Sequence, residues 1–277
     1  MEVVAVSYTI GLAQSTYPKD EDVIAQARDF AGRAASEGCD LLVFPENFMW
    51  PRKLSSEEVA DLAEPVDGPF VQHMCKVARE FGMWIVFTIN EYNPDGGLPY
   101  NTAVAVDNAG ALRGSYRKCH LYDALGVRES DRLSAGAQPA QPVHAPFCTM
   151  GMQVCYDLRF PESARIAALA GCNLMVYPSA WHVGRCKPDQ WETLLRARAV
   201  ENELFVAGVC RSGRGFVGQS MVVDPMGRVL ARGGRAAKEG LDQLVTCTID
   251  PAVLQSTRKS MPILGHRRPE LYSEILS

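Results

Sequence analysis

The sequence lacks any run of about 20 apolar residues, so no transmembrane helix is expected. It also lacks an excess of positive charge, because 28 Lys and Arg residues stand against 32 Asp and Glu residues and leave a formal net charge of −4. This balance argues against a nucleic-acid-binding protein, which usually carries a basic surface. The apolar stretch near residue 10 follows Glu2 rather than a basic segment, which favours a strand over a signal peptide.

Clustered metal ligands are missing as well. The nine cysteines form no CxxC pair and no cluster with the five histidines, so no zinc site of the usual spacing is predicted. Scattered cysteines without an export signal are typical of reduced thiols in a cytoplasmic protein. Internal repeats, low-complexity tracts and a long Pro/Gly/Ser linker are also absent, which predicts a single domain over 1–277.

What the sequence does contain is a regular alternation of strand and helix patterns. Hydrophobic residues make up 47% and charged residues 22%, as in ordinary globular proteins, and the alternation predicts the α/β class with helices outside the sheets. The segment 262–277 looks extended, and we expect it either to follow the surface or to cross onto a partner subunit. Strands are predicted within 3–14 and at 41–44, 84–90, 102–107, 149–154, 174–177, 204–209, 219–223, 229–231 and 244–249, and helices at 20–35, 70–81, 163–170 and 190–202.

Cys155 is the first candidate for chemistry because it lies at a predicted strand-to-helix turn. A strand-like run ends at Val154, and Pro161 followed by Glu162 is typical of a helix start. A nucleophile at such a turn is exposed, and the nearby backbone N–H groups can hold an oxyanion. Position alone is a weak signal, since a free cysteine is more often a small buried apolar residue.

Three ionisable residues are further candidates. Glu46 follows the apolar run 42–44, where α/β folds place ligands, and we expect burial to raise its pKa and suit it to act as a general base. Lys118 lies at the end of a strand, where its charge is expected to stabilise an oxyanion and lower the pKa of a nearby thiol. Glu129 could supply a second carboxylate. Taken singly, each is more often an ordinary surface residue.

Several short motifs occur together in a fixed order. They are FPEN at 44–47, YRKCHLY at 116–122, RES at 128–130, CYDLRFPE at 155–162, YPSAW at 177–181, RARAVEN at 196–202 and GQSMVVDPMG at 218–227. This ordered set spans nearly the whole chain and resembles the nitrilase superfamily of carbon–nitrogen hydrolases. The resemblance implies a four-layer α-β-β-α sandwich and a homodimer or larger homo-oligomer.

The resemblance also implies roles for the candidates. Cys155 is the expected nucleophile, Glu46 the general base and Lys118 the group that stabilises the tetrahedral intermediate. Glu129 is expected to orient Lys118 or the substrate amide. The backbone N–H of Tyr156 is the expected second oxyanion donor, and no metal or other cofactor is implied.

The branch of the family is indicated by CYDLRFPE and YPSAW, which most resemble the amidases that include omega-amidase and deaminated-glutathione amidase. Tyr156 stands where nitrilases usually have Trp, which disfavours a nitrile substrate. We therefore expect hydrolysis of a small carboxamide to an acid and ammonia through a Cys155 thioester. The candidate substrate-binding residues are Asn47, Tyr122, Tyr156, Trp181 and His182.

Other functions stay open at this point. The same residues could hydrolyse an N-carbamoyl compound, which would release carbon dioxide as well as ammonia. Cys155 could instead work with His120 or His182, as in papain-like enzymes. A non-catalytic scaffold and a metal hydrolase are further alternatives, separated from an amidase by turnover and by resistance to chelation.

Overall fold

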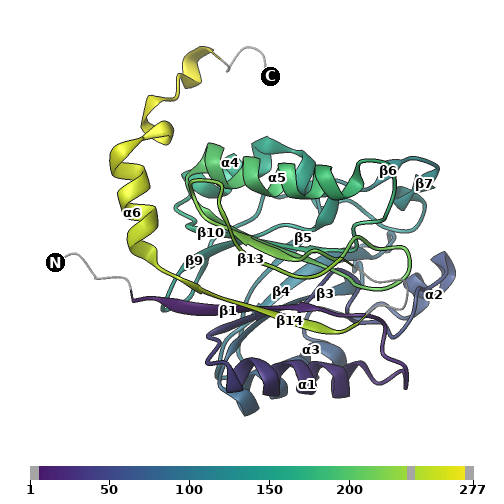
Figure 1. Cartoon of the computed structure of the whole chain (residues 1–277). Helices are drawn as coiled ribbons and strands as arrows, with labels where there is room; N and C mark the ends of the chain where they lie inside the picture. The colour runs from purple at the N-terminus through teal and green to yellow at the C-terminus, as the bar shows by residue number, and fades with distance from the viewer. Residues whose placement is uncertain (1–5, 236–240, 272–277) are drawn as a thin grey trace.

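The computed structural model describes residues 6–235 and 241–271, which form two six-stranded sheets flanked by helices (Figure 1). The strands are β1 Tyr8–Gln14, β2 Leu41–Val43, β3 Trp84–Glu91, β4 Tyr100–Val106, β5 Leu112–Arg117, β6 Asp123–Ala124, β7 Val127–Arg128, β8 Val143–His144, β9 Thr149–Met152, β10 Leu174–Ser179, β11 Phe205–Cys210, β12 Met221–Val223, β13 Val229–Arg232 and β14 Gln243–Ile249. The α-helices are α1 Val23–Ser36, α2 Ser56–Asp61, α3 Pro69–Phe81, α4 Pro161–Leu169, α5 Lys187–Asn202 and α6 Pro251–Ser260.

The two sheets share one pattern of strand directions. The first has the order β14-β1-β2-β3-β4-β5, with β1, β2 and β3 parallel and the outer strands antiparallel. The second has the order β13-β12-β11-β10-β9-β8, with β9, β10 and β11 parallel. Three parallel strands at the centre of each sheet therefore end side by side, and α/β proteins bind ligands at such ends.

Three apolar clusters separate four layers of structure. Side chains of both sheets, including Leu12 and Val176, form a core between the sheets. A second cluster, around Phe30 and Met74, packs α1 and α3 on the first sheet. A third, around Trp191 and Leu195, packs α4 and α5 on the second, so helices cover both outer faces (Figure 1). The predicted α-β-β-α sandwich is confirmed.

The ends of α1 follow from local sequence chemistry. The Asp22 side chain accepts a hydrogen bond from the Ala25 N–H at 2.8 Å and caps the helix, which therefore begins at Val23 rather than at residue 20. Gly38 has a φ of +70° just beyond the C-terminus, as predicted from its position. The spacing of Ala27, Phe30 and the other buried side chains turns one helix face to the sheet.

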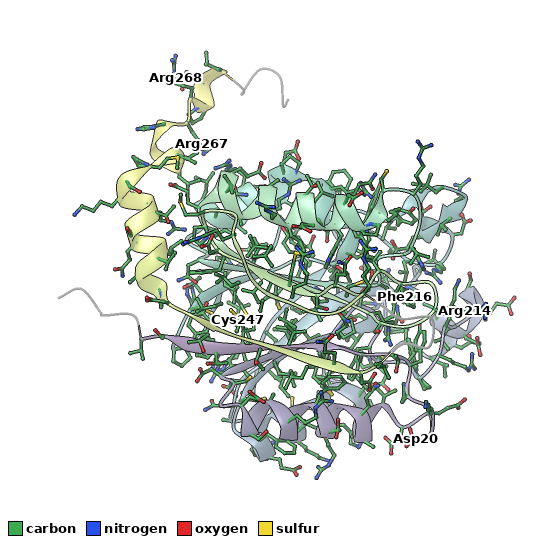
Figure 2. The ribbon with its side chains drawn as sticks, viewed as in Figure 1. Asp20, Arg214, Phe216, Cys247, Arg267 and Arg268 are labelled. Atoms are coloured by element: carbon green, nitrogen blue, oxygen red, sulfur yellow. The ribbon has the colours of Figure 1, made fainter. Side chains whose placement is uncertain are left out.

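The C-terminal segment differs from the prediction. Asp250 caps α6 through the Ala252 N–H, and Pro251 occupies the first helical position, so a helix precedes the segment predicted as extended. Residues 263–266 and 269–271 then form 3-10 turns, while 272–277 lie outside the described residues, as do 1–5 of the predicted first strand. Figure 2 shows Arg267 and Arg268 at the far end of this segment, away from the sheets.

Candidate active site

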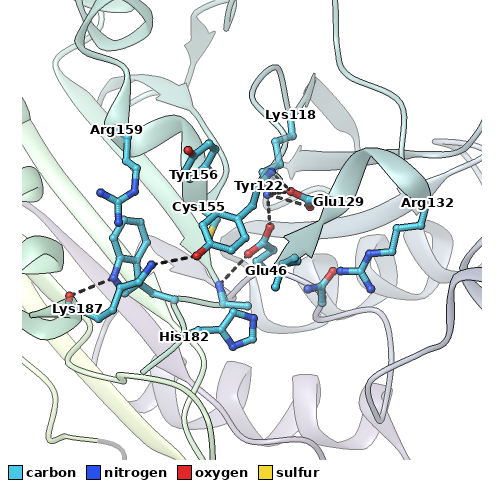
Figure 3. Close-up of a pocket in the computed structure, with 14 residues that line it drawn as sticks. Glu46, Lys118, Tyr122, Glu129, Arg132, Cys155, Tyr156, Arg159, His182 and Lys187 are labelled. Atoms are coloured by element: carbon cyan, nitrogen blue, oxygen red, sulfur yellow. Dashed lines mark hydrogen bonds and ion pairs between the residues drawn. The ribbon is translucent and has the colours of Figure 1, made fainter. Parts of the chain in front are cut away.

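The nine residues expected to take part in catalysis or substrate binding line one pocket, although they come from distant parts of the chain; His120, the alternative partner for Cys155, does not. The pocket has an empty volume of about 510 Å³ including its open mouth, and it lies where strands of both sheets end. Glu46 follows β2, Lys118 follows β5 and Cys155 follows β9, which explains why they converge. Figure 3 shows the lining residues, which include Glu46, Asn47, Lys118, Tyr122, Glu129, Cys155, Tyr156, Trp181 and His182.

Glu46 is a buried carboxylate whose oxygens are bound from three directions. It accepts hydrogen bonds from Asn101 Nδ2 at 2.8 Å, from Lys118 Nζ at 2.9 Å and from the Ala180 N–H at 2.8 Å. Only 3% of its surface is exposed. A buried charge is stable only when it is paired and hydrogen-bonded, and these contacts meet both requirements.

Lys118 joins the two carboxylates of the site. Its Nζ donates to Glu46 Oε1 at 2.9 Å and to the two oxygens of Glu129 at 2.9 and 2.8 Å. Glu129 also accepts the Tyr122 N–H at 2.7 Å. Lys118 is 1% exposed and Glu129 5% exposed, so one ammonium group and two carboxylates form a single buried, hydrogen-bonded cluster.

Cys155 begins the 3-10 helix Cys155–Arg159 with a φ of +47°, an uncommon conformation for a residue other than glycine. Its thiol lies beside the Glu46 carboxylate, and the side chain is partly exposed in the pocket. The N–H groups of Cys155 and Tyr156 are the first two of this helix, where no preceding helical carbonyl is available. The chain after β9 thus presents a thiol and backbone donors together, as expected of the predicted turn.

The ionisation states of the cluster follow from burial and charge. Burial raises the pKa of Glu46, but the charge of Lys118 and hydrogen bonds from Lys118, Cys155 and Ala180 outweigh it and hold this pKa below its ordinary value. Burial lowers the pKa of Lys118, but the charges of Glu129 and Glu46 hold it well above its ordinary value. Burial and then the charge of Glu46 raise the pKa of the Cys155 thiol well above its usual range.

The expectation that burial raises the pKa of Glu46 is therefore wrong, whereas the expected lowering effect of Lys118 on the thiol pKa is present. Burial alone does not decide the pKa of Glu46, because Lys118 lies in direct contact with it. Lys118 does favour the Cys155 thiolate, but burial and Glu46 act more strongly in the opposite direction. The resting site is accordingly a carboxylate, an ammonium ion and a neutral thiol, and the base needed for nucleophilic attack is already ionised.

Asp157 organises the turn that carries Cys155, a role not foreseen from the sequence. This fully buried carboxylate accepts hydrogen bonds from the Val154 N–H at 3.0 Å and from Tyr116 Oη at 2.9 Å. It also binds the His120 N–H at 3.0 Å and His120 Nδ1 at 2.7 Å, and the imidazole stacks on Phe160. His120 therefore supports the turn from behind and does not line the pocket.

Arg211 holds the chain that carries Glu46 and was also missed. It is fully buried at the end of β11, and its guanidinium donates to the Glu46 carbonyl at 3.2 Å and to the Asn47 carbonyl at 2.5 Å. Asn47 has a φ of +59°, so the chain turns sharply directly after Glu46. The only sequence signal for Arg211 is its place after an apolar strand, the position that also marked Glu46.

The pocket walls combine aromatic rings with cations. Lys187 is buried, donates to Tyr122 Oη at 3.3 Å and has no carboxylate partner among the described residues. The Arg159 guanidinium lies over Trp181, 4.7 Å from the ring centre. His182 is stacked on Phe216, and burial lowers the pKa of His182. Lys187 and Arg132 were not singled out from the sequence, because neither lies in a local motif that marks a site residue.

Two further properties concern the described residues only. Within 6–235 and 241–271, no helix is both long and apolar enough to cross a membrane. The same residues contain no group of three or more His, Cys, Asp or Glu side chains placed to hold a metal ion.

His182, the alternative partner for the nucleophile, lines the same pocket as Cys155. The group that interacts with the Cys155 thiol is Glu46.

Comparison with known proteins agrees with this geometry. The chain is 37% identical to the hydrolase C26A3.11 of Schizosaccharomyces pombe, covering 98% of this chain and 85% of that protein. It is 34% identical to the deaminated glutathione amidase of Bos taurus, covering 93% and 81%. It is 33% identical to the human omega-amidase NIT2, covering 91% of each protein.

Solved structures show the same fold. Saccharomyces cerevisiae Nit3, a member of the nitrilase superfamily, superposes with a TM-score of 0.83 at 29% identity, covering 97% of this chain and 99% of that one. A mutant amidase from Nesterenkonia sp., in which the acetamide moiety of fluoroacetamide is attached to the active-site cysteine, gives a TM-score of 0.80 at 26% identity, covering 98% and 97%. Residues 8–259 match the carbon–nitrogen hydrolase family, and the chain belongs to this family.

Proposed function

We propose that this protein is an amidase that hydrolyses a small linear carboxamide to a carboxylic acid and ammonia. The observation that carries the proposal is the contact of one ammonium group, Lys118 Nζ, with two carboxylates beside a partly exposed thiol in a pocket. The named amidases among the relatives support the same reaction class. Cys155, Glu46 and Lys118 are its catalytic residues.

Acylation begins with proton transfer from the Cys155 thiol to the Glu46 carboxylate, which lines the same pocket and interacts with the thiol. The sulfur then attacks the amide carbonyl carbon, and the carbonyl oxygen becomes an oxyanion. Glu46 returns the proton to the amide nitrogen, the carbon–nitrogen bond breaks and ammonia leaves. The product is a thioester between the acyl group and Cys155.

The oxyanion needs donors placed in advance, since reorganising them during the reaction would raise the barrier. Lys118 Nζ supplies a full positive charge, and the Tyr156 N–H at the start of the 3-10 helix supplies a dipole. Glu129 is a positioning residue, because its two oxygens hold Lys118 Nζ on the side away from the thiol (Figure 3).

Deacylation uses the same base a second time. Glu46 takes a proton from a water molecule, and the hydroxide attacks the thioester carbonyl. The second tetrahedral intermediate collapses to the carboxylic acid, and the proton on Glu46 returns to the Cys155 sulfur. Tyr122, Trp181, His182, Asn47 and the Tyr156 side chain form the walls that orient the acyl group.

Assembly and location are further parts of the proposal. We infer one catalytic domain that pairs as a homodimer, with the segment from 262 available to reach the partner. Ile166, Leu169 and Val200 are exposed apolar side chains on α4 and α5, as expected of a helical face that pairs. Sedimentation analysis distinguishes a dimer from a monomer.

Reduced cysteines support a cytoplasmic location, since those described are all unpaired.

The reaction is tested by measuring ammonia release from a panel of small amides, nitriles and carbamoyl compounds. The panel includes the monoamides of succinate and glutarate, with Cys155→Ala as the inactive control. Ammonia from amides, absent in the control, is the expected result. Ammonia accompanied by carbon dioxide, from carbamoyl compounds only, would replace amide hydrolysis with carbamoyl hydrolysis. Folded protein that is silent on every compound would overturn the proposal.

A further inference from the structure

The two carboxylate oxygens of Glu46 have different surroundings. Oε1 accepts hydrogen bonds from Asn101 Nδ2 at 2.8 Å and from Lys118 Nζ at 2.9 Å. Oε2 accepts one, from the Ala180 N–H at 2.8 Å. A carboxylate oxygen offers two lone-pair sites, so both sites of Oε1 are filled. The hydrogen bonds from the described residues leave one site of Oε2 open.

The thiol of Cys155 lies on the Oε2 side of this carboxylate. The Ala180 N–H, which binds Oε2, also acts on Cys155 and lowers the pKa of its thiol. One N–H group can act on both atoms only if the sulfur and Oε2 are neighbours. Figure 3 shows Cys155 and Lys118 approaching Glu46 from different sides. The oxygen with an open lone-pair site is therefore the one beside the thiol.

Asn101 ties the base to the lysine through two different groups. Its side chain donates to Glu46, and its backbone carbonyl accepts the Lys118 N–H at 2.8 Å. Asn101 is 1% exposed and lies within β4, which pairs with β3 on one side and with β5 on the other. A side chain on a strand that is held on both sides is positioned more precisely than one on a loop.

The amide of Asn101 supplies what this position needs and what other side chains would not. Asparagine is disfavoured within strands, so its place in β4 calls for a specific reason. An apolar side chain would leave a lone pair of Oε1 buried and unpaired, which is costly for a charged group. A second cation would compete with Lys118 for the same oxygen. A neutral N–H donor fills Oε1 and leaves the charge of the cluster unchanged.

We propose that Asn101 is a positioning residue that reserves Oε2 of Glu46 for the proton of Cys155, because Asn101 and Lys118 together keep Oε1 occupied. The proton passes from Sγ to Oε2 as the sulfur–carbon bond forms. It then passes from Oε2 to the amide nitrogen as the carbon–nitrogen bond breaks and ammonia leaves. One oxygen thus serves both transfers. This inference rests on the proposed amidase activity and deepens it by assigning the base to a single atom.

The test is the pH profile of kcat/KM on the best amide substrate, measured for Asn101→Leu and Asn101→Ala. Both variants lose the N–H donor but differ in bulk, so Asn101→Ala carries the test if Asn101→Leu does not fold. Removing a hydrogen bond to the ionised form of Glu46 raises its pKa. The acid limb of the profile should therefore move to higher pH by about one unit in both variants, and kcat should fall about tenfold.

The same two substitutions at Asn93 are the matched controls. Asn93 is also a buried asparagine, but its side chain bonds the Asp95 N–H at 3.0 Å and the Leu98 carbonyl at 3.1 Å, and it does not line the pocket. These variants should lose stability and keep the acid limb of the wild type. A merely structural role of Asn101 would give the same result at both positions.

Two results would overturn the inference while the amidase activity stands. One is an acid limb that Asn101→Leu and Asn101→Ala leave where the wild type has it. The other is an equal shift in the Asn93 variants, which would trace the effect to general loosening of the fold. A folded wild-type protein that releases no ammonia from any amide would overturn the amidase proposal itself, and the role of Asn101 with it.

Discussion

The Nζ atom of Lys118 lies 2.9 and 2.8 Å from the two carboxylate oxygens of Glu129, so that one carboxylate holds the ammonium group at two points. The third contact of this ammonium group is with Glu46. Glu129 therefore fixes the position of the Lys118 ammonium group relative to Glu46, the proposed general base. Among the described residues, no contact joins Glu129 to the Cys155 thiol.

Glu129→Gln tests this positioning. The amide cannot bind the ammonium group through two negative oxygens, so Lys118 should shift and kcat should fall about 100-fold, with a smaller change in KM. Steady-state kinetics on the best amide measure both constants. Glu37→Gln, an exposed site at the end of α1, serves as the matched control. Unchanged kcat in Glu129→Gln would contradict the assigned role.

The depressed pKa of Glu46 predicts how stability depends on pH. A carboxyl group with a lower pKa in the folded state contributes stability above its ordinary value of 4.5, and this contribution is lost as the pH falls through the folded value. Denaturant unfolding between neutral and acidic pH should show a steeper loss for the wild type than for Glu46→Gln. Parallel curves for the two proteins would contradict the depressed pKa.

The lowered pKa of Glu46 also predicts the pH dependence of catalysis. Because the general base stays ionised below pH 4.5, kcat/KM should not fall through protonation of Glu46 until the pH is below 4.5.

Thiol labelling tests how Cys155 is activated. Its own pKa is raised, so reactivity must come from proton transfer to Glu46 within a pocket that fits an amide. We predict that the amide-shaped reagent iodoacetamide labels Cys155 faster than the other eight cysteines near neutral pH, and that Glu46→Gln slows this labelling. Peptide mass spectrometry measures each site, and the exposed Cys186 provides the internal reference. Faster labelling of Cys186 than of Cys155 would argue against an activated thiol.

The four hydrogen bonds to Asp157 predict a large effect on stability. Asp157→Asn keeps the volume but removes the charge and turns an N–H₂ group toward donors, so the free energy of unfolding should fall by about 2–4 kcal/mol. Asp29→Asn, at an exposed side chain on α1, should change it by less than about 0.5 kcal/mol. Chemical denaturation of both variants gives the comparison. Equal stabilities would show that Asp157 does not hold the Cys155 turn.

Much of the site was predictable because its residues sit at strand ends in ordered motifs. Glu46 after 42–44 and Cys155 before Pro161 were marked by the change from apolar strand to polar turn. The sandwich followed from alternation together with the resemblance to a family. Two stacked sheets were not visible in periodicity, since a buried strand reads the same in either architecture.

The remaining features depend on contacts between distant segments. Asp157 binds His120, which is 37 positions away, and Arg211 binds the carbonyl of Glu46, which is 165 positions away; no local pattern records such contacts. The pKa of Glu46 was mispredicted because burial was weighed without the contact between Glu46 and Lys118. Short helices were missed although α2 begins with the Ser55–Glu58 capping box and α6 with Asp250 and Pro251, both recognisable start signals.

The most direct test of the central claim is the mass of the protein during turnover. The protein is mixed with its best amide substrate, quenched in acid and digested, and the peptide that contains Cys155 is weighed. The account predicts that this peptide carries the acyl group of the amide, that hydroxylamine removes it and that Cys155→Ala neither forms the adduct nor releases ammonia. Ammonia release that persists in Cys155→Ala, with no acylated peptide in the wild type, would contradict a thioester on Cys155.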